Sequence, residues 1–154
     1  MNSKLLLNFI RSFDKEIKAV YVPKIQPMFL AEDTIFIGDK FDNGADYFIE
    51  HMVEAHECPV ELVNSLSVEM WSILHEVGHF FTWDWEEWDE EQPARMVIES
   101  VTKKKALMSV ESIRRKSQFR HFNLPLEWMA TAWAIDYAVA HLEELKKADK
   151  IIFG

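Results

Sequence analysis

Two histidines four residues apart, His75 and His79, are the side chains in this sequence best placed to do chemistry together. They belong to the sequence His-Glu-Val-Gly-His, in which Glu76 follows the first histidine. Residues four apart lie on the same face of an α-helix, so both imidazoles can point at one metal ion. Glu76 lies one step round the helix, where its carboxylate can hold a water molecule rather than bind the ion. This pattern is typical of sites in which zinc lowers the pKa of water to about 7 and a carboxylate takes the proton.

An apolar segment precedes the motif and predicts the buried helix that carries it. Its apolar residues are Val68, Met70, Trp71, Ile73 and Leu74. Either Ser65 or Ser67 is suited to cap this helix, which we expect to end near Phe81 or Thr82. Gly78 lowers helix propensity by about 1 kcal/mol relative to Ala, which indicates that another backbone packs close to it. Two histidines on an exposed helix are the alternative, and the apolar surroundings argue against it.

Catalytic zinc usually has three protein ligands and one open position, so the sequence must supply a third ligand. The downstream candidates are Asp84, Glu99, His121, Glu127, Asp136 and His141. We favour Glu127, because it lies in the first turn of a predicted helix, where the helix dipole favours an ionised carboxylate. Asp84 and His121 remain the alternatives, since ligand type alone permits any of these residues.

The longest predicted helix spans residues 125–148, and Pro125 fits its first turn. Small residues, Ala130, Ala134 and Ala138, lie on the same side of this helix as Glu127. Small residues let two helices approach closely, and Gly78 offers a matching gap on the metal helix. We therefore expect these two helices to pack together.

Three short β-branched or aromatic segments, at residues 19–22, 28–30 and 34–37, predict a small sheet. The last of them is apolar on both faces, and we expect it to be covered on both sides. Further helices are predicted at residues 4–19 and 46–57, with a short turn from Pro59 to Leu66. The expected fold class is α+β: one helix-rich, zincin-like domain over residues 1–154, with a small sheet beside the buried HExxH helix.

Composition narrows the possible functions. The net charge of -9 argues against non-specific nucleic-acid binding as the main function. The single cysteine, Cys58, excludes an internal disulfide. We find no secretory signal and no membrane-spanning run, so a cytoplasmic protein without a membrane partner is expected.

Two charged segments and two further histidines lie outside the candidate site. Residues 83–91 combine acidic residues with tryptophans, and we interpret them as a solvated loop, or alternatively as a wall of a substrate cleft. A helix is predicted to begin near Pro93, and residues 103–120 are mainly basic. His51 and His56 are interpreted as surface or capping histidines and are left out of the site.

The two motifs together resemble a known family. The sequence HEVGH at 75–79, followed by Glu127-Trp-Met-Ala130-Thr-Ala-Trp133-Ala134, resembles the ImmA/IrrE family of zinc metallopeptidases. This resemblance implies a gluzincin-like site, with His75, His79 and Glu127 binding zinc and Glu76 acting as general base. Members of the family include phage and mobile-element proteases that cleave repressor proteins.

The function we expect is that of a zinc-dependent peptidase acting on a protein or peptide, which could be a repressor-type regulator. A further donor should stabilise the oxyanion. His121 is our candidate for this role, and Tyr137 is a weaker one. A catalytically silent zincin-like module with a structural zinc is the alternative, and hydrolysis of a non-peptide amide is a third option. The sequence predicts no direct nucleic-acid partner and does not indicate an oligomeric state.

Overall fold

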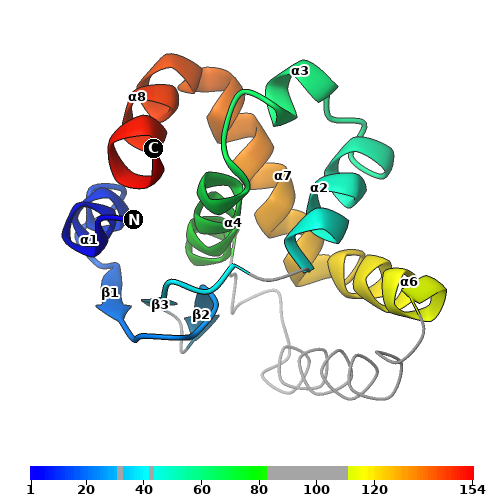
Figure 1. The fold of residues 1–154 in the computed structure, drawn as a ribbon, viewed down its shortest axis with the longest axis horizontal. Helices are drawn as coiled ribbons and strands as arrows, with labels where there is room; N and C mark the ends of the chain where they lie inside the picture. The colour runs from blue at the N-terminus through cyan, green and yellow to red at the C-terminus, as the bar shows by residue number, and fades with distance from the viewer. Residues whose placement is uncertain (31–32, 42–43, 83–110) are drawn as a thin grey trace.

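The computed structural model describes residues 1–30, 33–41, 44–82 and 111–154. These residues form a helix-rich α+β arrangement, as the sequence predicts, with one small sheet (Figure 1). The elements in chain order are α1 (Ser3–Arg11), β1 (Lys18–Tyr21), β2 (Met28–Leu30), β3 (Thr34–Ile37), α2 (Gly44–Glu54), α3 (Val60–Val63), α4 (Val68–Thr82), α6 (Glu111–Phe122), α7 (Pro125–Ala140) and α8 (Leu142–Phe153).

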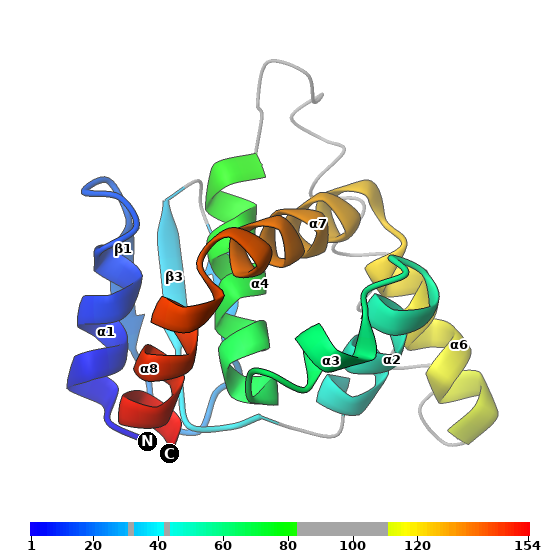
Figure 2. The same cartoon turned by 90° about the horizontal axis from the view of Figure 1, so that it is seen from above.

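Helix α4, which carries the HExxH motif, lies at the centre of the described structure. Figures 1 and 2 show α1 and α8 on one side of α4 and α2, α3 and α6 on the other, while α7 crosses α4 and packs against it. Ser67 caps α4 as predicted, because its Oγ accepts a hydrogen bond of 3.1 Å from the Met70 N–H. Ser67 in turn donates its N–H and hydroxyl to the Asp149 carboxylate of α8, at 2.7 and 2.6 Å. The start of α4 is therefore fixed to α8, the C-terminal helix.

Both sides of α4 are buried, in two separate apolar clusters. Trp71 and Leu74 belong to the cluster shared with α2 and α7, whereas Ile73 and Val77 belong to the cluster shared with α1 and the sheet. These four side chains are fully buried. Full burial of an aliphatic or aromatic side chain contributes about 1.5–3 kcal/mol, so α4 is held by packing on both faces.

The sheet has the strand order β1-β3-β2, with β3 parallel to β1 and antiparallel to β2. Ile35 and Ile37 of β3 point into the core and are fully buried. Thr34 and Phe36, on the opposite face, are partly exposed, so the expected cover on both sides is incomplete. Strand β2 is an edge strand within the described sheet, and it packs against α4.

The predicted helix over residues 4–19 is too long, because α1 ends at Arg11. Two local hydrogen bonds compete with the helix there: the Ser12 hydroxyl donates to the Phe9 carbonyl at 2.6 Å, and the Asp14 carboxylate accepts from the Glu16 N–H at 2.8 Å. Asn2 caps the start of α1, because its Oδ1 accepts a hydrogen bond of 3.1 Å from the Leu5 N–H.

The predicted helix over residues 125–148 is interrupted at His141, whose φ of -128° and ψ of 29° are not helical. The break turns α8 back on the molecule, where Leu145 and Ile152 are buried. A straight helix would carry these side chains away from the core. The helix predicted at 46–57 also ends early, at Glu54, and Glu57 has a φ of 55°.

Some expectations fall on residues that are not described. The acidic segment 83–91, the helix beginning near Pro93 and residues 103–110 of the basic segment lie outside the described residues. Within the described part, none of the helices combines the length and the apolar character needed to cross a membrane.

Candidate metal centre

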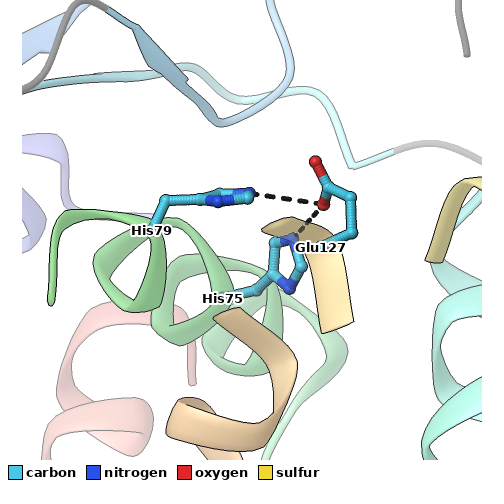
Figure 3. A group of neighbouring side chains, drawn as sticks. All are labelled: His75, His79 and Glu127. Atoms are coloured by element: carbon cyan, nitrogen blue, oxygen red, sulfur yellow. Dashed lines mark hydrogen bonds and ion pairs between the residues drawn. The ribbon is translucent and has the colours of Figure 1, made fainter. Parts of the chain in front are cut away.

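Helices α4 and α7 bring together three side chains that can bind one metal ion, His75, His79 and Glu127. Their ligand atoms all lie within 4.8 Å of one another, and among the described residues these three form the only such group. Glu127 Oε2 lies 2.6 Å from His75 Nε2 and 3.3 Å from His79 Nε2. Figure 3 shows both imidazoles reaching from α4 toward the carboxylate on α7. The structure thus brings together the three residues that the sequence predicts as ligands.

The close approach of the two helices depends on Gly78, which lies between the two histidines. A Cβ at this position would overlap the carbonyl oxygen of Ala130 on α7. The predicted pairing of Gly78 with the small residues of the last helix is therefore confirmed. Because Glu127 lies one turn before Ala130 on α7, this contact sets the distance between the carboxylate and the imidazoles.

Neighbouring side chains orient the two imidazoles. The hydroxyl of Thr131, one turn after Glu127, lies 2.9 Å from His75 Nδ1. The ring of Phe29, from β2, stacks on His79 with 5.8 Å between centroids and 20° between planes. Both histidines are 6 % exposed. Packing and hydrogen bonding thus fix both imidazoles before any ion binds.

Burial and neighbouring charges shift the pKa values of all three side chains. Burial lowers the pKa of His75, despite the hydrogen bond to Glu127. Burial also disfavours protonation of His79, but the Glu127 and Glu76 carboxylates outweigh it and raise the pKa of His79 to about 8. Burial disfavours ionisation of Glu127, but the two imidazoles hold its pKa well below its usual range. Both shifts favour an ionised Glu127 beside a protonated His79.

The donor set fits a divalent transition metal. Two imidazole nitrogens and one carboxylate oxygen are the ligands of a common class of catalytic zinc site, which leaves one position open. A tetrahedral ion about 2.0–2.1 Å from each ligand sets its ligand atoms roughly 3.3 Å apart. The distance from His79 Nε2 to Glu127 Oε2 is 3.3 Å. The shorter contact, of 2.6 Å, from His75 Nε2 to Glu127 Oε2 is a direct hydrogen bond, which would have to open for both atoms to bind one ion.

No family model, curated protein or solved structure matches this chain. A function for this chain is therefore inferred from the geometry of the described residues.

Glu76 lies beside the three ligands, in the position expected for a base. It is half-buried on α4, and the backbone of Phe29 in β2 forms a hydrogen bond with its carboxylate. Burial raises the pKa of Glu76 to about 8 in the metal-free protein. A cation held by the neighbouring ligands would favour the ionised carboxylate, because the charge of a bound ion dominates such a site.

His121 lies at the edge of the centre, at the end of α6. Its Nε2 is 3.6 Å from Glu127 Oε2, and it lies outside the group of three ligands. Tyr137 points elsewhere, because its ring packs against Phe13, Trp133 and His141. The structure therefore leaves His121 near the ligands and removes Tyr137 from consideration.

The remaining ligand candidates do not join the group. Asp136 is exposed on α7, and His141 lies at the break before α8, 3.8 Å from Glu144. Asp84 and Glu99 lie outside the described residues.

The interpretation of His51 and His56 as surface or capping histidines is wrong for His51, which is fully buried. Its Nε2 donates a hydrogen bond of 2.7 Å to Asn123 Oδ1. His56 stacks on Trp128 with 3.8 Å between ring centroids. Both histidines remain outside the metal group, as expected from the sequence.

Sequence reasoning missed Thr131 and Phe29, the two residues that orient the imidazoles. A threonine inside an apolar helix is only weak evidence for a residue that orients a ligand, because its hydroxyl often forms a hydrogen bond within its own helix. Phe29 lies in a predicted strand, where an aromatic residue is common and does not indicate a functional site. Only the spacing of Thr131, four residues after Glu127, offered a clue, since such residues share a helix face.

Proposed function

We propose that the chain is a zinc-dependent peptidase. Its main support is the convergence of His75, His79 and Glu127, with ligand atoms within 4.8 Å of one another and Glu76 beside them. When bound, zinc would act as a Lewis acid and lower the pKa of water to about 7.

Glu76 is the proposed general base. Its carboxylate accepts a proton from the attacking water and delivers it to the leaving amine. General acid–base catalysis of this kind contributes typically about 10²–10⁴-fold. The hydrogen bond from the Phe29 backbone supports the role, because it holds the carboxylate beside the metal ligands.

His121 is the proposed donor to the oxyanion. Its Nε2 lies 3.6 Å from Glu127 Oε2, close enough to the ligands to reach a carbonyl oxygen held there. In the part of the chain that is described, it is the additional imidazole beside the carboxylate ligand. A preorganised N–H donor in this position stabilises the charge that develops as water attacks the carbonyl.

The proposed substrate is an extended segment of a protein or peptide. Strand β2 is one of the two edge strands of the described sheet, and its Phe29 contacts both Glu76 and His79. An extended substrate can add to such an edge through backbone hydrogen bonds, which would place a peptide bond beside the ligands. The resemblance to the ImmA/IrrE family implies a repressor-type regulator as the substrate.

The test compares Glu76→Gln with Glu69→Gln, a matched change two turns earlier on the same helix. Both variants and the wild type are loaded with zinc, quantified by elemental analysis and incubated with a proteome-derived peptide library. Mass spectrometry then detects new peptide termini. We expect all three proteins to bind one zinc, and only Glu76→Gln to lose cleavage.

Zinc binding without cleavage by the wild type would favour the alternative, a catalytically silent interaction module with a structural zinc. Cleavage that survives in Glu76→Gln would remove the proposed base from the mechanism. A wild-type protein that binds no zinc would overturn the proposal entirely.

A further inference from the structure

Helix α7 presents two polar side chains to His75, one turn apart. Glu127 Oε2 lies 2.6 Å from Nε2 of this imidazole, and Thr131 Oγ1 lies 2.9 Å from Nδ1. Thr131 is fully buried, although it is a polar residue on an otherwise apolar stretch of the helix. Both nitrogens of His75 are thus held by the same helix.

The contact to Glu127 determines which nitrogen of His75 carries the proton in the metal-free protein. A separation of 2.6 Å between Nε2 and Oε2 requires a proton between the two atoms. A carboxylate oxygen accepts, so Nε2–H is the donor in this hydrogen bond, and Nδ1 of a neutral imidazole is left with a lone pair. The Thr131 hydroxyl must then donate to Nδ1.

Metal binding reverses this arrangement. An ion takes the lone pair of Nε2, so the proton of a neutral imidazole moves to Nδ1. Nδ1–H is buried and then needs an acceptor. A hydroxyl can donate in one state and accept in the other by rotating about its Cβ–Oγ bond, whereas a carboxylate only accepts and a methyl group does neither.

We propose that Thr131 is the positioning residue of His75: its hydroxyl donates to Nδ1 in the metal-free protein and accepts from Nδ1–H when Nε2 binds a metal ion. Thr131 thereby keeps the ring in one orientation through the change of tautomer. This inference rests on the proposed metal site and adds to it a residue that touches neither metal nor substrate.

The test uses Thr131→Val, which preserves the branched shape and removes the hydroxyl, and Thr131→Ser, which keeps the hydroxyl. Thr82→Val is the matched control, because the Thr82 hydroxyl donates to the Gly78 carbonyl within α4 at 2.8 Å. Zinc affinity is measured by competition with a chromophoric chelator. We expect Thr131→Val to bind zinc about 10–100-fold more weakly, as is usual for loss of a residue that orients a ligand. Thr131→Ser and Thr82→Val should stay close to the wild type.

A second measurement follows the tautomer directly. Long-range ¹H–¹⁵N NMR spectra of the wild type should show His75 protonated at Nε2 without metal and at Nδ1 with zinc. This readout depends on neither catalysis nor the folding of a variant. The inference is overturned if Thr131→Val binds zinc as tightly as the wild type, if Thr131→Ser binds as weakly as Thr131→Val, or if the tautomer is the same in both states. A wild type that binds no zinc overturns the metal site itself, whereas loss of cleavage alone leaves this inference standing.

Discussion

Replacing Gly78 by Ala tests whether the helix contact, rather than helix propensity, governs this part of the molecule. Propensity alone predicts a gain of about 1 kcal/mol, because Ala is a better helix former than Gly. The structure predicts the opposite. An Ala Cβ would lie 3.0 Å from the carbonyl carbon of Ala130 and 3.1 Å from its Cα, and would overlap its carbonyl oxygen. Carbon atoms prefer separations of about 3.5–4.0 Å, so α7 must move outward.

Overfilling a packed core costs about 1–3 kcal/mol. The atoms that collide with the new Cβ belong to backbone, which cannot rotate away, so we expect a cost near the upper end of that range. Subtracting the propensity gain leaves a net loss of about 2 kcal/mol. For a chain of 154 residues this corresponds to a Tm about 4–8 °C lower. Since Glu127 moves with α7, zinc affinity should also fall at least about tenfold, which is roughly 1.4 kcal/mol.

The assay combines thermal unfolding of the metal-free protein with zinc competition. Ser72→Ala, on the same helix, is the control for propensity, because among the described residues the Ser72 hydroxyl donates to the Val68 carbonyl within α4, at 2.9 Å, and its loss should change Tm little. The double variant Gly78→Ala with Ala130→Gly should not recover stability, because the collision is with backbone atoms of residue 130. A Gly78→Ala protein as stable as the wild type would refute the reasoning, and so would full rescue by Ala130→Gly.

Three further predictions concern the proposed ligand Glu127, His121 and the half-buried His56. Glu127→Ala should reduce the zinc content sharply, as measured by elemental analysis, and an unchanged zinc content would mean that another residue is the third ligand. His121→Ala should keep one zinc and lower kcat by about 10²–10³-fold. Burial lowers the pKa of His56 from 6.5 to about 4, so the unfolded chain binds this proton first as the pH falls. The free energy of unfolding therefore has its full value, as far as His56 is concerned, above about pH 6.5. It falls as the pH is lowered toward 4, by about 1–2 kcal/mol after allowance for the partial exposure of His56. Urea unfolding of the wild type and of His56→Phe at pH 7.5 and 4.5 measures this change in the free energy of unfolding. An equal change in the two proteins would contradict the prediction.

The metal helix and its partner could be predicted from the sequence because their signals are local. The spacing of His75 and His79, the cap at Ser67 and the gap at Gly78 each follow from helix geometry. Glu127 was recognisable because a carboxylate in a first turn is favoured by the helix dipole. The strands were also predicted within a residue or so at each end, since short β-branched runs separated by turn residues are a clear signal.

Other features depend on contacts between distant parts of the chain, and no local signal reports them. The break at His141 occurs without Gly or Pro; it lets Leu145 and Ile152 reach the core and brings Asp149 of α8 to Ser67. The end of α1 at Arg11 was obscured because the apolar spacing continues to Ile17, which is buried for a different reason, just before β1.

The chemistry of the site and the packing of the fold are not separable in this protein. Within five residues, α7 supplies the proposed metal ligand Glu127, the contact surface for Gly78 at Ala130 and the Thr131 hydroxyl that lies against His75. These three positions share one helix face because they are spaced by three and four residues. A shift of α7 by a single residue turns the helix by about 100° and moves it about 1.5 Å, which would displace all three side chains together. Ala130 must pack against Gly78, and this contact fixes the register of α7 relative to α4. The same register places Glu127 and Thr131 on either side of the His75 imidazole.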